Sequence, residues 1–454
     1  MLRLFDTASR EVRELALRQP NTLSVYVCGP TVYGPPHIGH GRMALVFDVL
    51  RRYAEWSGLE VRFVSNVTDI DDRIIERAAR EERPWDEIAQ RCEQVWFGAM
   101  DRLDVKTPTD VPHATEYVAQ IVTMIGELVD IGRAYVTDDG VYLTASSVED
   151  YGLLAHQSLD EMLAGGGERE VFGAENKREP ADFVLWKLSK PGEPSWPSPW
   201  GAGRPGWHSE CVVMSLDILG EGFDLHGGGM DLQFPHHENE RAQAVALGKR
   251  FANHWVHNGF VVDTTGEKMS KSLGNVDNLL DLLDHYDPRA YRLVVLQSHY
   301  RGPLRVVEDN LDAAVTTLAG LDAFVARTSD VRLAPPDAEV MARFVSCMED
   351  DLDTSAAMAV LFETVRKANS ALDAGDDAAG SLVAAVGEIC EAVGLRLRAG
   401  ADAPDDVLDK ARDLDAARAS RDFATADAIR AELHDEGWIV ETTKGGTTVR
   451  EGRS

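Results

Sequence analysis

A strand–helix–strand pattern near the N-terminus constrains the fold of this chain most. Residues 24–28 form an apolar run stopped by a Gly-Pro pair, as in a short buried strand. Residues 42–56 follow with the apolar spacing of a helix, and residues 61–64 predict a second strand. Loops of this length are typical of a βαβ unit in a parallel, doubly wound α/β sheet. Such sheets bind ligands at the carboxyl ends of their strands, where Cys28 and the turn at residues 66–68 are expected.

The rest of the pattern divides the chain into several parts. At 454 residues the chain is too long for one compact core. Residues 85–199 mix helices with one strand at 141–143, and we interpret them as an insertion between two halves of the sheet. Sheet-like signals resume at residues 223–226 and 255–262. Residues 273–436 are predicted to be almost wholly helical, and a short strand pair follows.

The composition predicts a soluble protein of the cytoplasm. The N-terminus lacks the long apolar core of a signal peptide, and no apolar run approaches a membrane span. Five cysteines without a close pair argue against a disulfide framework and for a reducing compartment. The net charge of −30, taken alone, argues against a nucleic-acid partner. We interpret the excess acid as a solubilising surface, with which a local basic stripe can coexist.

Residues 36–41, PHIGHG, lie between the first predicted strand and helix. Free backbone N–H groups and the helix dipole favour anions at such a position. His37 and His40 are three residues apart, so both could donate hydrogen bonds to phosphate oxygens. The alternatives are a loop with two surface histidines and a metal-binding pair.

Residues 266–272, GEKMSKS, follow a predicted strand. Lys268 and Lys271, with a hydroxyl between them, can neutralise a triphosphate and its transition state. Flanking glycines at 266 and 274 suit a loop that closes over ATP. The alternative is a solvated basic turn. Neither Gly-x-Gly-x-x-Gly nor a Walker-type loop is present, so the commonest nucleotide cradles are excluded.

Residues 225–232, LHGGGMDL, end another predicted strand. A glycine run that includes Gly229 permits close contact between the backbone and an adenosine, and Asp231 could accept hydrogen bonds from ribose hydroxyls. The alternative is a flexible turn.

Four side chains far apart along the chain form a possible zinc set: Cys28, Cys211, His236 and Glu240. Pro235 suits the first turn of a helix, on which His236 and Glu240 would share one face. Soft sulfur binds zinc far better than a neutral hydroxyl does, so zinc beside a nucleotide site suggests that the substrate is a thiol. The alternatives are unreactive core cysteines and a satisfied core histidine.

In this order, the segments resemble those of the cysteinyl-tRNA synthetases, class I aminoacyl-tRNA synthetases known for HIGH and KMSKS signatures. The similarity spans essentially the whole chain. The matching segments are residues 28–33, 37–40, 66–72, 182–187, 194–211, 226–229, 234–240, 268–272 and 421–430.

The resemblance implies ATP-dependent activation of L-cysteine to cysteinyl-adenylate, with Mg²⁺ accompanying ATP, and transfer to the 3′ end of tRNA(Cys). It also implies one Zn²⁺ per chain and a monomeric protein in the cytoplasm. In the family pattern, the zinc ligands are Cys28, Cys211, His236 and Glu240. The phosphates are faced by His37 and His40, and a mobile loop contains Lys268 and Lys271. The adenylate is contacted by Thr68, Trp207, Gly229, Asp231 and Lys271.

The same resemblance predicts the domain organisation. The expected architecture is a Rossmann-like α/β catalytic domain with an insertion, followed by α-helical C-terminal domains. The predicted parts are the first half of the catalytic domain (1–100), the connective insertion (101–205), the second half (206–262), the KMSKS loop and stem-contact region (263–305), a tRNA-binding helical bundle (306–400) and a small anticodon-binding domain (401–454).

Three other functions compete with this interpretation. The first is the related cysteine ligase of mycothiol synthesis, whose amino-sugar acceptor does not need the long helical region. The second is a zinc hydrolase with Glu238 or Glu240 as base, which leaves residues 268–272 without a role. The third is a non-catalytic RNA-binding protein on a synthetase scaffold, which the intact signatures argue against. For a tRNA partner, we expect basic side chains on one face, drawn from Arg289, Arg292, Arg301 and Arg305.

Overall fold

The computed structural model describes residues 2–157, 175–262, 278–399, 405–420, 422–443 and 446–451. The chain divides into two compact units. The first comprises Met1–Asp312, Met341–Val360 and Glu391–Leu395, and the second comprises Ala313–Val340, Leu361–Cys390 and Arg396–Ser454. Among the described residues, no helix combines the length and the apolar character that crossing a membrane requires.

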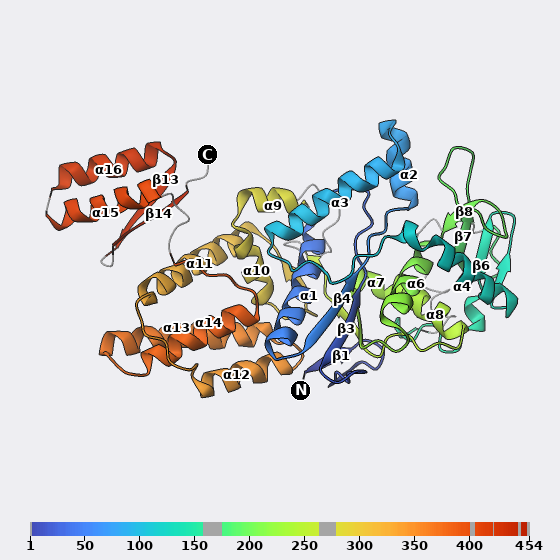
Figure 1. Ribbon diagram of the computed structural model, residues 1–454, viewed down its shortest axis with the longest axis horizontal. Coiled ribbons are helices and arrows are strands. Elements are labelled where there is room, and N and C mark those ends of the chain that lie inside the picture. Colours follow the sequence, from blue (N-terminus) through green and yellow to red (C-terminus); the bar gives the residue numbers. More distant parts are fainter. Residues whose placement is uncertain are drawn as a thin grey trace. The chain divides into compact units, whose positions relative to one another are not determined.

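The first unit is built on a parallel sheet with the strand order β10-β9-β3-β4, of which β3 and β4 are labelled in Figure 1. Its strands are β3 (Thr22–Val27), β4 (Glu60–Ser65), β9 (Leu225–Gly229) and β10 (Trp255–Asn258). β3 is buried along nearly its whole length, as expected for a central strand of a parallel sheet covered on both faces, whereas the edge strand β4 exposes Glu60 and Arg62. The predicted βαβ unit and doubly wound sheet are therefore confirmed. The single strand expected at 255–262 is two strands, because β11 (Val261–Val262) leaves the sheet to pair with β12 (Leu304–Arg305).

Helix α1 (Ile38–Trp56) connects β3 to β4 and packs on the sheet. Its apolar face buries Leu45, Phe47 and Leu50, each worth about 1.5–3 kcal/mol. Phe47 lies directly against β9, because a Cβ atom on Gly227 would stand 2.3 Å from the Phe47 ring. Position 227 therefore has to be glycine because helix α1 packs against it. The sequence had suggested a different reason, namely contact between the glycine run and an adenosine.

A buried ion pair holds α1 against α10 (Pro288–Leu296). Asp48 accepts from Arg292 at 2.7 Å and also from Arg52, and both Asp48 and Arg292 are buried. Arg292 is therefore unable to contact a tRNA, and its predicted place on a basic face is wrong. The burial of Arg292 cannot be predicted from the apolar spacing of its helix, because a guanidinium is normally exposed. Its burial depends on the partner carboxylate of Asp48, which lies on a helix distant in sequence.

The insertion forms its own antiparallel sheet rather than the one strand that was expected. Helix α4 (Val118–Asp130) packs on strands in the order β5-β6-β7-β8. The strands are β5 (Ala134–Val136), β6 (Gly140–Leu143), β7 (Phe183–Leu188) and β8 (Gly203–Pro205). Three were missed because β5 and β8 are only three residues long, and because β7 (FVLWKL) lacks a clear alternation of apolar and polar residues. Helix α6 (Trp207–Leu219) then returns the chain to the parallel sheet.

An ion-pair network ties α2 (Asp72–Glu81) to the insertion. Asp72 accepts from Arg204 at 2.6 Å and from Lys187. Burial would raise the pKa of Asp72, but these two cations lower it. Its contribution to stability is therefore present above the unfolded pKa and is lost as pH falls through the lowered folded value.

We expect Asp72→Asn to lower the free energy of unfolding by about 1 kcal/mol at pH 7. The difference from the wild type should be smaller at pH 3, because part of this contribution is lost once pH falls below the ordinary pKa of Asp, about 3.9, toward the lowered folded value. Urea unfolding at both pH values measures it. Glu76→Gln, on an exposed residue of the same helix, is the control and should change nothing. Equal losses at both pH values would contradict the ion-pair explanation.

Apart from a strand pair at each end, the remaining described elements are helices, and the sequence predicted the C-terminal pair and the helices of residues 273–436. The first unit begins with a hairpin of β1 (Arg3–Asp6) and β2 (Glu11–Glu14), which the sequence did not reveal. The other helices are α3 (Trp85–Arg102), η1 (Ala114–Tyr117), η2 (Ala145–Ser147), α7 (Met230–Leu232), η3 (Gln233–His237), α8 (Glu238–Ala246), α9 (Leu279–His285), α11 (Glu308–Thr328), α12 (Ala338–Glu349), α13 (Thr354–Ala374), α14 (Ala379–Ala392), α15 (Asp405–Ala419) and α16 (Phe423–Asp435). The C-terminal strand pair consists of β13 (Trp438–Thr443) and β14 (Gly446–Glu451).

Candidate active site

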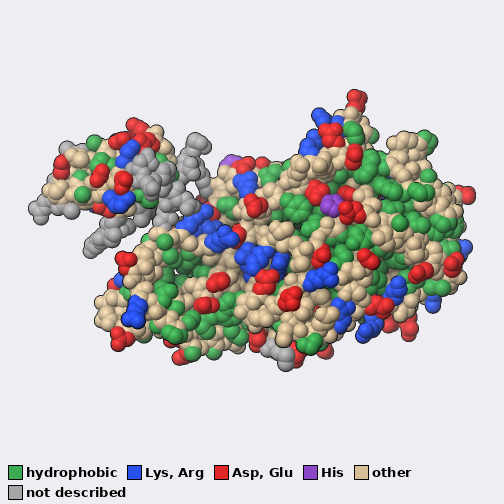
Figure 2. Space-filling view, viewed as in Figure 1, with side chains coloured by type: hydrophobic (Ala, Val, Ile, Leu, Met, Phe, Trp, Pro, Cys, Tyr) green, Lys and Arg blue, Asp and Glu red, His purple; other side chains and the backbone are tan. Residues whose placement is uncertain are grey.

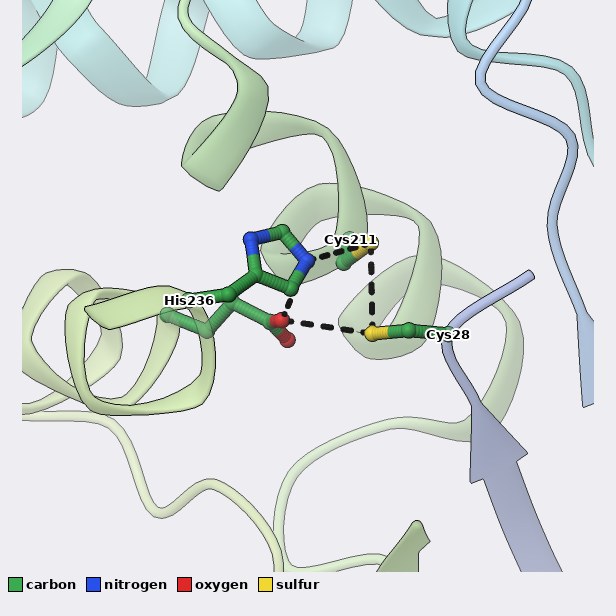
Figure 3. A group of neighbouring side chains, drawn as sticks. Cys28, Cys211 and His236 are labelled. Carbon is green, nitrogen blue, oxygen red and sulfur yellow. Dashed lines mark hydrogen bonds and ion pairs between the residues drawn. The ribbon is translucent and has the colours of Figure 1, made fainter. Parts of the chain in front are cut away.

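Side chains from three segments meet in one buried group. Cys28 follows β3 and Cys211 lies in α6, whereas His236 precedes α8 and Glu240 lies within it. Figure 3 shows Cys28, Cys211 and His236 pointing toward one another. The two Sγ atoms are 3.6 Å apart, and Cys28 Sγ is 3.3 Å from Glu240 Oε1. The four donor atoms, which the sequence picked out, all lie within 4.8 Å of one another and could hold a metal ion.

The predicted helix through His236 and Glu240 is observed. Phe234 has extended backbone angles (φ −141°, ψ 134°), and the helical turn that follows it from Pro235 leads directly into α8. His236 and Glu240 therefore share one face, with Nε2 3.0 Å from Oε1.

The donor set and its spacing fit tetrahedral zinc. Zinc bonds thiolate sulfur at about 2.3 Å and imidazole nitrogen at about 2.0–2.1 Å, so the edges of such a tetrahedron are about 3.3–3.8 Å. The observed Cys211 Sγ to His236 Nε2 distance is 3.6 Å. A second group, made of Cys28, His226, His237 and Glu240, shares two ligands with the first. The first group suits zinc better because it offers two sulfur ligands instead of one.

Charges within the group favour a bound cation. Burial and the neighbouring Cys211 raise the pKa of Cys28 well above its usual range. Burial would also raise the pKa of Cys211, but hydrogen bonds with Cys28 and His236 lower it to about 6. Burial opposes ionisation of Glu240, yet the charges of His226 and His236 hold its pKa well below the usual range. Burial would lower the pKa of His236, but the charge of Glu240 raises it to about 10, so at neutral pH the group holds a thiolate, a carboxylate and an imidazolium. A metal ion bound here would take the place of the imidazolium proton and balance the two negative charges.

Two further histidines orient the donors, and sequence reasoning missed them. His208 Nδ1 lies 2.9 Å from His236 Nδ1, which turns Nε2 of His236 toward the thiols. His226 Nε2 lies 2.7 Å from Glu240 Oε2, which leaves Oε1 facing the thiols. Partners of this kind fix the orientation of ligands in metal sites. Both histidines stand inside motifs noted from the sequence, but spacing alone does not reveal their contacts.

A pocket of about 360 Å³ lies at the carboxyl ends of the strands, where the sequence placed the ligand site. Its lining includes Cys28 after β3, Gly229 and Asp231 after β9, and Asn258 at the end of β10. This volume is in the range of small-molecule sites, about 300–1,000 Å³. Cys28 belongs both to the buried donor group and to the pocket lining, so the candidate metal centre adjoins the pocket.

His37 and His40 stand at the start of α1 and line the same pocket. Each ring accepts a backbone hydrogen bond on Nδ1: His40 N–H donates to His37 at 3.2 Å, and His37 N–H donates to His40 at 3.1 Å. A neutral imidazole that accepts on Nδ1 carries its proton on Nε2. The helix cap therefore fixes both rings in the tautomer that can donate to a phosphate oxygen.

Of the other residues predicted to contact the nucleotide, some line the pocket and some do not. Trp207 lines the pocket and stacks on His236, with ring centroids 3.9 Å apart. Thr68 is not part of the pocket lining: it is only 1% exposed, and its hydroxyl donates to Glu210 at 3.0 Å. Lys268 and Lys271 lie outside the described residues.

Comparison with solved structures defines the class of protein. Mycobacterium tuberculosis methionyl-tRNA synthetase in complex with methionyl-adenylate is similar with a TM-score of 0.60 at 15% identity, over 82% of this chain and 90% of that chain. A putative arginyl-tRNA synthetase from Campylobacter jejuni gives a TM-score of 0.52 at 13% identity, over 83% and 91%. The fold is therefore that of the tRNA synthetases of class I.

Sequence comparison narrows the class to a family. A model of the class I (C) tRNA synthetase catalytic domain matches residues 14–316, and a DALR domain model matches residues 343–398. The cysteine–tRNA ligase of Streptomyces avermitilis is 41% identical over 98% of both proteins. That of Caldicellulosiruptor saccharolyticus is 40% identical over 99% of both. This chain belongs to the cysteine–tRNA ligase family.

Proposed function

We propose that the chain activates L-cysteine with ATP and transfers it to the 3′ end of tRNA(Cys), with zinc selecting the substrate thiol. The family assigns the overall reaction, that of a cysteine–tRNA ligase. The observation that carries the finer proposal is the double position of Cys28, in a sulfur-rich donor group and in the wall of the nucleotide pocket. An amino acid held there by its sulfur has its carboxylate near the phosphates of ATP.

Activation requires attack of the cysteine carboxylate on the α-phosphate of ATP, with pyrophosphate leaving. In our proposal, His37 and His40 donate from Nε2 to the phosphate oxygens as negative charge develops, which is the largest kind of catalytic contribution in such sites. Lys268 and Lys271 neutralise the leaving group. Asp231, Gly229 and Trp207 hold the adenylate. Thr68 acts from below the pocket surface, through its hydrogen-bonding neighbours.

Zinc would be held by Cys28, Cys211, His236 and Glu240 and would supply a bond to sulfur that serine does not match. A pocket of ordinary contacts separates near-isosteric substrates only weakly, by about 10–200-fold for one methylene. His208 and His226 hold two of the donors in place, so these donors are already oriented for a metal ion.

The partners follow from the two steps. L-cysteine and ATP, with Mg²⁺, bind in the first unit, and tRNA(Cys) reaches its pocket from the helical C-terminal domains. On the face drawn in Figure 2, Lys and Arg side chains gather around the position of α10, while Asp and Glu are spread over the rest. Arg305 is exposed and is our first candidate for the acceptor stem. We place the protein in the cytoplasm as a monomer, and the predicted domain limits remain part of the proposal.

Cysteine-dependent exchange of pyrophosphate into ATP, followed by charging of tRNA(Cys), tests the proposal. Dialysis against a zinc chelator should abolish the preference for cysteine over serine, and added Zn²⁺ should restore it. A zinc hydrolase predicts no exchange. Transfer of cysteine to an amino sugar but not to tRNA would favour the mycothiol-type ligase and overturn our choice.

A further inference from the structure

One basic side chain at the edge of the pocket has no role in the function proposed so far. Among the described residues that line the pocket, Arg73 is the only lysine or arginine. It lies in the first turn of α2, which follows β4. Its side chain is 45% exposed, so an incoming ligand can reach it.

Two contacts hold this guanidinium in place over the pocket. Nε of Arg73 donates to Asp71 at 2.8 Å, and its Cζ lies 4.4 Å from the centre of the Tyr33 ring. The backbone of Tyr33 is fixed in turn, because its carbonyl accepts from Arg77 at 2.7 Å. An arginine carries five N–H donors, more than these contacts use, so its planar fork is preorganised to bind an anion.

The position of Arg73 separates it from the proposed adenosine site. The strand order is β10-β9-β3-β4, so β4 and β10 are opposite edges of the sheet, about 14 Å apart at the usual strand spacing. Asp231 and Asn258, at the ends of β9 and β10, lie on the adenosine side. His37 and His40, after β3, lie between the two sides. An anion at Arg73 therefore approaches the reaction centre from the side away from the nucleoside.

The second substrate of the proposed reaction is also an anion, and it has to reach the same centre. The single-stranded 3′ end of tRNA brings its terminal hydroxyl to the adenylate, and its last phosphodiester groups come with it. With a net charge of −30, the protein repels a polyanion unless a local cation marks the entrance. Arginine suits this contact because it pairs with phosphate through two parallel hydrogen bonds.

We infer that Arg73 binds a phosphodiester group near the 3′ end of the tRNA and positions that end for transfer. The inference rests on the proposed function, since it names a residue for the second step. It predicts a split between the steps: activation of cysteine does not need Arg73, whereas transfer does.

The test compares Arg73→Gln with Arg73→Lys and with a matched control, Arg80→Gln. Arg80 is exposed on the same helix and does not line the pocket, so its replacement removes the same charge without touching the entrance. Cysteine-dependent pyrophosphate exchange measures the first step. Single-turnover transfer to tRNA(Cys) from preformed adenylate measures the second.

We expect Arg73→Gln to reduce transfer about tenfold with exchange within twofold of the wild type, and Arg73→Lys to recover part of the loss. In a plot of the logarithm of the tRNA-binding constant against the logarithm of the salt concentration, the slope for Arg73→Gln should be less steep by about 0.7. This is the change expected for the loss of one phosphate contact on a single strand. An acceptor-stem hairpin with its 3′ single strand should bind the glutamine variant less tightly than the wild type, and one without that strand should bind both equally.

Other results would overturn the inference. A higher KM for ATP in exchange would assign Arg73 to the triphosphate, and equal loss of both steps with a lower Tm would make its role structural. Unchanged transfer would give it no role. If the wild type itself fails to charge tRNA, the proposed function is wrong. If the wild type charges tRNA normally and Arg73→Gln does so equally well, only the inference about Arg73 is wrong.

Discussion

Replacing Cys211 by serine is expected to remove the metal and, with it, most of the activity toward cysteine. The thiolate of Cys211 lies 3.6 Å from both Cys28 Sγ and His236 Nε2, and a serine hydroxyl at the same place is a poor zinc ligand at neutral pH. We expect zinc content to fall from about one per chain to near zero. The kcat/KM for cysteine in pyrophosphate exchange should drop about 10³-fold, or about 4 kcal/mol.

The ratio of cysteine to serine activation is the sharper measurement, because a general loss of activity leaves a ratio unchanged. In Cys211→Ser, the ratio of cysteine to serine activation should fall to the value that ordinary pocket contacts provide without a metal ion. Cys390→Ser is the matched control: this cysteine is buried in α14, away from the donor group, so its replacement should leave both zinc and selectivity intact. A zinc-free Cys211→Ser enzyme that still prefers cysteine would refute selection through the metal.

The second large effect is expected at His40, where two functions of one ring can be separated. Nδ1 of His40 accepts from the His37 N–H and caps α1, while Nε2 carries the proton proposed for phosphate. Asparagine places its oxygen near the position of Nδ1, whereas glutamine places its amide near Nε2. We expect His40→Asn to keep the cap and to lose about 10²–10³ in the kcat of pyrophosphate exchange.

In the complementary variant, His40→Gln, the amide can replace the Nε2 donor, so part of the activity should remain. Loss of the cap should instead lower the free energy of unfolding by about 1 kcal/mol. Exchange kinetics and thermal unfolding on both variants separate the two roles. If His40→Asn, which keeps the cap, retained the activity and His40→Gln, which keeps the donor, lost it, His40 would act only through the position of α1.

The sequence predicted the catalytic core well because its signals are local. The strand–turn–helix from β3 into α1 follows from apolar periodicity and a Gly-Pro stop, and both elements are observed with small shifts of their ends. Four metal donors were also predicted, since their residue types and the likeness to a known family point to one chemistry. Where the periodic signal is weak, as in the insertion, three of the four strands of the sheet were missed.

The failures concern residues whose environment is made by distant parts of the chain. Arg292 seemed a surface cation until Asp48, from another helix, allowed its burial. Gly227 seemed to make room for a ligand, but it makes room for Phe47. In both cases the sequence shows the residue and not its partner, so the energy that decides its position does not appear in any local pattern.

The sequence by itself thus determined the βαβ unit, the identity of the donor atoms and the class of chemistry, because periodicity and residue type are local properties. Only the tertiary structure decided that Cys28 serves both the donor group and the pocket, that His208 and His226 orient its neighbours, and that Arg73 lines this pocket at the start of the helix after the edge strand β4. These are contacts between segments far apart in sequence, and packing of the sheet and its helices is what brings them together.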